Sequence, residues 1–324
     1  MTEQSQINIE KQQHDSVSKN KVLMPLLRVT FSLVILFLIF RAVDINEVKN
    51  VIAATQYQWL LLALVFQILS TLLAGYRWSL VMAIMNFVDD VSFYIKSYFK
   101  GSFFNQGLPT SIGGDAIRVL DVAATGHRKR DAFTGVFVDR LLGLTGLLIM
   151  TLIASLANPT LLPEGLFLVI NLIVLGGLAA FMTVLFFYKL ALFERWRLGR
   201  YLIRTSQQLM RVMCGFKNSS IQMGLGIIIH LLSMLNIYCI GIGVGLEFDF
   251  MTYLVIVPPA ILLTLVPISL AGWGVREGAL IGLFTLLGAD QSTILSLSVL
   301  YGLTLIVASL PGLQVYLAGK KVIK

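Results

Sequence analysis

The chain is short of charged residues, cysteine and histidine, and each shortage excludes a kind of protein. Only 13% of its 324 residues are charged, whereas a soluble domain averages about 25%. Its two cysteines, Cys214 and Cys239, are too few for a disulfide framework. Its three histidines form no metal-spaced cluster with them. We therefore expect no metal site and no cofactor.

Signatures of catalysis are also absent from the sequence. It contains no Walker A, G-x-S-x-G or H-E-x-x-H pattern, so ATP-driven and ordinary hydrolase chemistry have no support. The net charge of +8 does not indicate a nucleic-acid partner. The basic residues lie at the edges of apolar stretches, where they orient a membrane protein and meet anionic headgroups. The sequence therefore favours a protein that is not an enzyme, and we predict no catalytic residues.

Long hydrophobic stretches make up most of the chain. Hydrophobic residues account for 57% of it, and the mean hydropathy is +0.83. A helix needs about 20 residues to cross about 30 Å of hydrocarbon. Seven stretches reach or approach that length: Met24–Val43, Gln58–Tyr76, Ala132–Ala154, Gly165–Tyr188, Ile221–Gly245, Phe250–Val266 and Ser292–Leu317. The chain is therefore an integral membrane protein, with Phe250–Val266 marginally short for a full span.

Two weaker segments, Phe93–Leu108 and Glu277–Leu287, look like partial spans. The predicted fold class is an all-α polytopic membrane protein. It has about seven full transmembrane helices plus two broken or re-entrant helical hairpins, which form an inverted repeat.

Lysine and arginine are distributed unevenly among the segments between these stretches, and they mark the cytoplasmic side. The basic segments are the N-terminal tail, His127–Arg130, the loop at 189–217 and the C-terminal end. Ser155–Glu164, Glu247–Asp249 and Gly288–Gln291 contain neither residue and are expected to face outward. Both termini are then cytoplasmic, in the cytoplasmic membrane.

Three parts follow from this organisation. Residues 1–23 form a disordered cytoplasmic tail, because they are polar and lack periodicity. Residues 24–318 form a single transmembrane domain, and residues 319–324 a cytoplasmic basic tail. Within the domain, the loop at 189–217 alternates arginines with apolar residues and is expected to form an amphipathic helix on the inner leaflet.

One motif occurs twice. The sequence PTSIGGDAIR at 109–118 reappears as PISLAGWGVR at 267–276, at a constant offset of 158 residues. Proline, serine, glycine and arginine match in register: Pro109 with Pro267, Ser111 with Ser269, Gly114 with Gly272, and Arg118 with Arg276. Polar, broken backbone beside apolar helices is expensive at membrane depth and is usually functional. A pair of such breaks in corresponding halves points to a transporter's binding site.

The predicted topology inverts the second copy relative to the first. The unit Ser92–Gly126 begins and ends on the cytoplasmic side, whereas Phe250–Gly288 begins and ends outside, and three full spans lie between them. The two hairpin tips would then approach each other near the midplane. The competing interpretation makes Phe250–Leu270 a full crossing and puts Arg276 at the cytoplasmic edge.

Each copy has the chemistry of an anion site. Glycines permit unusual backbone angles and close approach, and Asp115 is placed to cap a helix that begins near Ala116. The N–H groups at a helix start favour anions, and Arg118 or Arg276 would add a bidentate grip on a phosphate. The alternative is an ordinary loop at the membrane edge, with its arginine reaching toward lipid phosphates.

A further pair of charges, Asp139 and Arg140, lies inside the stretch Ala132–Ala154. Charges at that depth face a bundle interior or a wet cavity. Asp139 either pairs with a motif arginine or cycles a proton, or it belongs to a structural ion pair; Glu277 beside Arg276 has the same ambiguity. The predicted substrate-binding residues are Ser111, Gly113, Gly114, Asp115, Arg118, Asp139, Arg140, Ser269, Gly272, Arg276 and Glu277.

The segments LPTSIGGDAIRVLDVA, AFTGVFVDRLLGL and LVPISLAGWGVREGALIGLF resemble the transmembrane region of lysylphosphatidylglycerol synthases. The resemblance covers most of the chain after Met24. The same region occurs alone in bacterial and archaeal membrane proteins described as flippase-like. In the full synthase it is linked to movement of an aminoacylated lipid between leaflets, and a separate soluble domain makes that lipid. We expect no such domain here, so the resemblance implies lipid handling without aminoacyl transfer.

By motif matching, the resemblance carries over to Arg118, Asp139, Arg140, Arg276 and Glu277. The predicted function is to bind an anionic phospholipid or lipid-linked headgroup, or to move it between leaflets. Three alternatives stay open: a secondary transporter for a small anion, an intramembrane transferase that uses a lipid-linked donor, and a scaffold for a lipid- or envelope-modifying enzyme. Expected partners are the lipid substrate, the membrane, and either a partner enzyme or further copies of the chain.

Overall fold

The computed structural model describes residues 44–87, 90–107, 113–265, 269 and 272–320, and six single positions between 30 and 41. Within these residues all regular structure is helical, which confirms the all-α class. The segments at 1–23 and 321–324 lie outside the described residues. The predicted basic tail at 319–324 begins inside a helix, since the last helix continues to Lys320.

Five described helices are long and apolar enough to cross a membrane. They are α3 (Tyr57–Ile84), α6 (Lys129–Ala157), α7 (Glu164–Phe186), α9 (Phe216–Gly243) and α12 (Gln291–Lys320). They correspond to five of the seven predicted spans. Most of Met24–Val43 lies outside the described residues. The remaining span, Phe250–Val266, is the short helix α10 (Phe250–Thr264).

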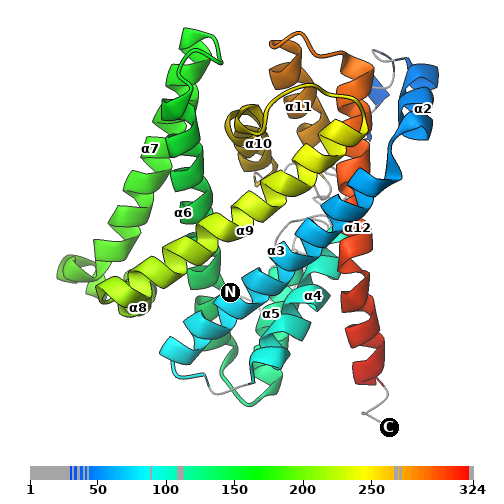
Figure 1. The fold of residues 1–324 in the computed structure, drawn as a ribbon. Coiled ribbons are helices and arrows are strands. Elements are labelled where there is room, and N and C mark those ends of the chain that lie inside the picture. Colours follow the sequence, from blue (N-terminus) through cyan, green and yellow to red (C-terminus); the bar gives the residue numbers. More distant parts are fainter. Residues whose placement is uncertain are drawn as a thin grey trace, which may run out of the picture.

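The two repeat units are helical hairpins that enter the bundle from opposite ends. In the first, α4 (Val91–Gly107) returns as α5 (Gly113–Ala124); in the second, α10 returns as α11 (Val275–Thr285). Figure 1 shows α4 and α5 in the lower half of the bundle and α10 and α11 in the upper half. The 15 residues of α10 extend about 22 Å, less than the hydrocarbon thickness. α10 by itself is therefore too short for a full crossing.

Long helices enclose the hairpins. α3 and α9 run side by side obliquely through the bundle and make its most extensive helix contact. α4 packs on α12 so closely that a Cβ on Gly312 would lie 2.1 Å from the backbone oxygen of Phe99. α6 contacts both α5 and α10, so it is a shared neighbour of the two hairpins.

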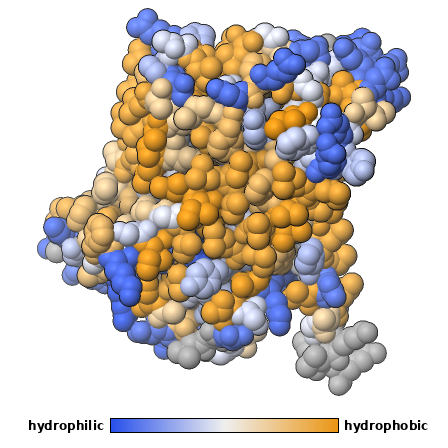
Figure 2. All heavy atoms as spheres, in the orientation of Figure 1, coloured by the Kyte–Doolittle hydropathy of each residue, from blue (hydrophilic) through white to orange (hydrophobic). Residues whose placement is uncertain are grey.

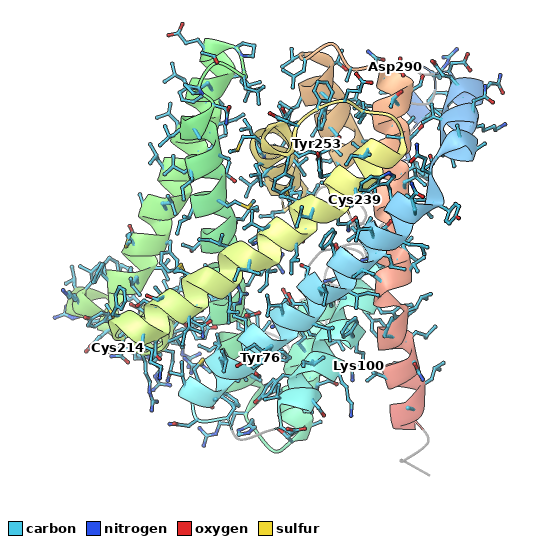
Figure 3. The ribbon with its side chains drawn as sticks, in the orientation of Figure 1. Tyr76, Lys100, Cys214, Cys239, Tyr253 and Asp290 are labelled. Carbon is cyan, nitrogen blue, oxygen red and sulfur yellow. The ribbon has the colours of Figure 1, made fainter. Side chains whose placement is uncertain are left out.

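The basic segments lie at one end of the bundle. His127–Arg130, α8 (Arg197–Met213) and the C-terminal end of α12 occupy the lower end in Figure 1, which we call the basic end. The connections that lack lysine and arginine, α6–α7, α9–α10 and α11–α12, lie at the opposite end. Figure 3 shows Asp290 at that opposite end. Figure 2 shows an apolar band between two hydrophilic ends, as expected for a chain that spans a bilayer.

Two helices lie at these ends. At the basic end α8 is amphipathic, as predicted for the loop at 189–217, and buries Leu209 and Val212. At the opposite end α2 (Ile45–Ala54) packs on α12, where Ser292 donates a hydrogen bond of 2.8 Å to Glu47.

Candidate functional site

The first hairpin is held in shape by polar contacts between its own two helices. The N–H of Gly114 donates to the side-chain oxygen of Asn105 at 2.6 Å. A Cβ on Gly114 would lie 2.1 Å from the carbonyl oxygen of Gly101, so only glycine permits this approach. Further from the tip, Asp121 accepts hydrogen bonds from Ser97 at 2.7 Å and from Lys100. The start of α5 is therefore fixed in position relative to α4.

Arg118, the arginine of the first motif, is buried within the bundle. Its guanidinium lies 4.0 Å from the ring centroid of Trp78 and 4.6 Å from that of Tyr98. Nη2 donates to Oδ2 of Asp139 at 2.6 Å, and Nη1 donates to Oδ1 of Asp115 at 3.1 Å. Charge-assisted bonds of this kind are among the strongest in proteins. The pairing of Asp139 with a motif arginine, one of the predicted alternatives, is thus present.

Arg77 is the network member that the sequence analysis missed. It donates from Nε and Nη2 to Oδ1 of Asp139 at 3.2 and 2.8 Å, and from Nη2 to the backbone oxygen of Asp139 at 2.9 Å. We predicted that the apolar stretch would end at Tyr76, but α3 continues to Ile84. The apolar residues that follow Trp78 were the available signal, because they extend the span and place Arg77 inside it.

Asp115 and Arg140 connect this network to a more accessible region. Arg140 donates to Oδ2 of Asp115, and their side chains are 34% and 18% exposed. The predicted capping role of Asp115 is corrected, since α5 begins at Gly113 and Asp115 lies within its first turn. Its carboxylate instead joins Arg118 to Arg140. Three arginines and two aspartates then form one cluster, which we call the first arginine cluster, with a formal charge of +1.

Buried donors remain unused in the first arginine cluster. Among the described residues, Nη1 of Arg77 and Nε of Arg118 contact no acceptor. A cluster with a surplus positive charge and spare N–H groups is suited to attract an anion.

The second hairpin holds its arginine differently. Arg276 donates from Nε and Nη2 to Oε1 of the adjacent Glu277 at 3.1 and 2.6 Å. Ser298 on α12 contacts both residues, at 3.1 Å to Arg276 and 2.9 Å to Glu277. Rings of Trp273 and Tyr301 lie 4.8 and 5.4 Å from the Arg276 guanidinium. We call this group the second arginine cluster; its formal charge is zero.

The turn before α11 depends on glycine. Gly272 and Gly274 have φ angles of +83° and +86°, which other residues rarely adopt. This turn allows the N–H of Gly274 to donate to Oε2 of Glu277 at 2.6 Å. Ser269 is buried, and its hydroxyl has no hydrogen-bond partner among the described residues.

The predicted site residues therefore fall into two separate groups. Arg118, Asp115, Asp139 and Arg140 come together, and Arg276 pairs with Glu277. Within the described part of the chain, no hydrogen bond or ion pair links one group to the other. Ser111 lies outside the described residues. Gly113, Gly114, Ser269 and Gly272 flank the two hairpin turns.

An apolar groove leads to the exposed side of the first arginine cluster. It has a volume of about 590 Å³ and is lined by α5, α6 and Leu265 at the end of α10. Asp115 and Arg140 are its charged lining residues. Leu120 and Phe133, on its two sides, are 51% and 48% exposed, so the groove opens sideways. Leu265, at the end of α10, thus lines the same groove as Asp115 near the start of α5.

Two further cavities lie near the hairpins. A polar cavity of about 270 Å³ between α3, α4, α9 and α12 is lined by His230 and Tyr98, and its described lining contains no lysine or arginine. His230 bonds the backbone oxygen of Gly143 at 2.9 Å. An apolar groove of about 360 Å³ separates α7 from the second hairpin, and its described lining contains no polar side chain. No group of three His, Cys, Asp or Glu residues in the described chain could hold a metal ion.

Comparison with known proteins agrees with these features. The sequence model of the family described as the lysylphosphatidylglycerol synthase TM region matches residues 26–312. That range contains both hairpins, the two arginine clusters and the lateral groove. A search of curated proteins gave no match. The match spans most of the chain, and the chain belongs to the family of the lysylphosphatidylglycerol synthase transmembrane region.

Proposed function

We propose that this membrane protein binds an anionic phospholipid or lipid-linked molecule and moves its headgroup between the two leaflets. The observation that carries the proposal is the lateral groove, whose apolar walls end at Arg140 and Asp115. Acyl chains can occupy such walls while the bilayer covers the open side. The headgroup phosphate would meet Arg140, which is partly exposed, before it reaches Arg118.

The charge of the first arginine cluster supports this assignment. Burial of an isolated ion is costly, so an anionic headgroup needs a compensating positive charge inside the bundle. The cluster supplies one surplus positive charge, and Asp115 provides the link from Arg140 to the buried Arg118. A headgroup that displaces Asp115 from Arg140 would gain a bidentate partner.

The alternatives have less support. Among the described residues that line the polar cavity beside α4, none is a lysine or arginine that could serve as counter-charge to a small anion. A transferase would need a carboxylate as a base, but Asp115, Asp139 and Glu277 each pair with arginine. Each of these carboxylates is therefore already held by an arginine and is not free to approach a donor headgroup.

Liposomes that contain the purified protein test the proposal. They should exchange a labelled anionic phospholipid between leaflets faster than empty liposomes, without ATP or a partner. Leu120→Trp, which fills the groove, should slow the exchange. The matched control is Leu172→Trp on α7, because Leu172 is 65% exposed and lines none of the described cavities. Equal rates in protein-containing and empty liposomes, across several anionic headgroups, would rule out autonomous transport.

A further inference from the structure

A second cationic region lies at the basic end, away from the hairpin tips. Two adjoining cavities of about 360 and 530 Å³ share Arg130, Tyr201 and Arg204 in their linings. The smaller one lies between the end of α3, the start of α6 and α8, and the larger one lies along α8. We call the two together the α8 pocket. Figure 1 places α8 at the lower end of the bundle.

Four arginines line the α8 pocket. Arg130 comes from α6, and Arg197, Arg200 and Arg204 come from α8. The three on α8 are three and four residues apart, which puts them on one face of the helix. The described ion pairs include none of the four. Among the described lining residues only Asp131 is acidic, so the pocket is strongly positive.

Neutral polar groups in the pocket also lack partners. The hydroxyl of Tyr201 and the side-chain oxygen of Gln208 are buried and make no hydrogen bond with the described residues. The Tyr201 ring lies 5.2 Å from the Arg130 guanidinium. Buried polar atoms are normally hydrogen-bonded, so an unpartnered hydroxyl beside four arginines indicates a missing acceptor. Phosphate oxygens are acceptors that suit the Tyr201 hydroxyl and the arginine N–H groups.

Packing holds α8 in place and so fixes the geometry of the pocket. Leu209 and Val212 are fully buried on its inner face. The hydroxyl of Ser206 donates to the backbone oxygen of Leu185 at 3.0 Å and accepts from the N–H of Tyr188 at 2.9 Å. The arginines therefore project from a helix that is anchored to α7. A free solvated helix would not keep them around one cavity.

Apolar residues at the start of α8 indicate where the α8 pocket lies relative to the bilayer surface. Trp196 and Leu198 are 65% and 68% exposed. Tryptophan and leucine exposed beside arginines are typical of a helix that lies at the headgroup level of a bilayer. The pocket is thus accessible to lipid headgroups and to soluble molecules.

We propose that the α8 pocket binds a phosphate-bearing anion, on a lipid headgroup or on a soluble molecule, at a site separate from the lateral groove. The ligand's phosphate is held by Arg130 and Arg204, which line both cavities, and it accepts the hydroxyl proton of Tyr201 in a hydrogen bond. This binding does not require that the protein transport lipid.

Two probes distinguish the sources of the phosphate. The full chain is reconstituted in phosphatidylcholine nanodiscs, and pyrophosphate binding is measured by calorimetry. In parallel, retention of phosphatidic acid added to the nanodiscs is measured by native mass spectrometry. Arg130→Gln and Arg204→Gln should each weaken binding of at least one probe about tenfold or more, the usual effect of losing a charge-assisted bond. The affected probe identifies the source.

Lys217→Gln is the matched control, since Lys217 is an exposed cation near α8 that lines neither cavity. It should leave binding unchanged. Tyr201→Phe removes only the buried hydroxyl and should weaken binding of the same probe by a smaller factor. Binding is compared only among variants whose thermal unfolding matches that of the wild-type protein. Failure of the wild-type protein to bind either probe, or equal weakening by Lys217→Gln, would overturn the proposal.

Discussion

The two hairpins each bury one arginine between aromatic rings, yet they neutralise it in different ways. Arg118 belongs to a cluster drawn from α3, α5 and α6, which keeps one surplus positive charge. Arg276 pairs with Glu277, the next residue on its own helix, and keeps none. The groove beside the first hairpin ends at charged residues, whereas the groove beside the second is lined by apolar residues. We infer that the first hairpin binds the anion, whereas the second has a structural role in the bundle.

The largest expected difference concerns the two buried carboxylates. Asp139→Asn leaves both Arg77 and Arg118 without their shared counter-charge, so we expect it to cost about 3–5 kcal/mol of stability. Glu277→Gln leaves one arginine unpaired and should cost less, about 1.5–3 kcal/mol. Thermal unfolding in detergent measures both, with Glu247→Gln in an exposed connection as control. A larger loss for Glu277→Gln than for Asp139→Asn would contradict the comparison.

The glycines of the two turns should also differ. A Cβ on Gly114 meets the backbone of α4 at 2.1 Å, and such overpacking costs about 1–3 kcal/mol or more. A Cβ on Gly272 meets the Thr264 side chain at 3.2 Å, and its positive φ costs a non-glycine residue about 1–2 kcal/mol. Gly114→Ala should therefore lower the unfolding temperature more than Gly272→Ala. The reverse order would show that the second turn is the tighter one.

Lipid affinity tests the difference in charge directly. Arg140→Gln should weaken retention of an anionic phospholipid about tenfold through the loss of a charge-assisted bond. Its effect on stability should be small, because its ion pair is partly exposed. Arg276→Gln should leave retention unchanged in protein that remains folded. Native mass spectrometry of lipid-bound protein provides the measurement, and an equal loss in both variants would remove the functional distinction between the hairpins.

The smallest expected effect lies at the start of the second hairpin. Asp249 caps α10 by accepting from the hydroxyl and the N–H of Thr252, at 2.6 and 2.8 Å. The hydrogen bond from the Thr252 hydroxyl, followed by that from its N–H, lowers the pKa of Asp249 below its usual value of 3.8. The cap therefore stabilises the fold above that value and is lost as pH falls through the lowered pKa. Asp249→Ala should lower the stability by about 1 kcal/mol at neutral pH. The difference from the wild type should disappear at a pH below the lowered pKa. Thermal unfolding of both proteins over a range of pH measures it.

The sequence was most informative about features that repeat or have a clear period. Apolar length predicted the five described helices that are long enough to span, and the repeated motif predicted two helical hairpins, each with one arginine. The uneven distribution of lysine and arginine among the connecting segments predicted which of them lie at the same end of the bundle. Each of these signals is local, or depends on a count along the chain.

The missed features depend on contacts between distant residues. Arg77 lies 62 residues from Asp139 along the chain, and no local pattern indicates that they meet. The capping role given to Asp115 was wrong because the helix starts earlier, at Gly113, which frees the carboxylate for Arg118 and Arg140. The lateral groove likewise needs α5, α6 and α10 in their packed positions. Charge partners and cavities arise from tertiary packing, which spacing alone does not specify.

The packing of α4 on α12 has a consequence for how the protein is made. At about 5–20 residues per second, synthesis of α12 begins roughly ten to forty seconds after α4 is complete. Until then α4 lacks a principal neighbour, and a helix with Lys96, Lys100, Asn105 and Gln106 is poorly suited to bare lipid. We expect the first hairpin to wait at the membrane surface and enter the bundle last. A cysteine at Lys100 should then react with a water-soluble thiol reagent in chains stalled before α12 and be protected in complete ones.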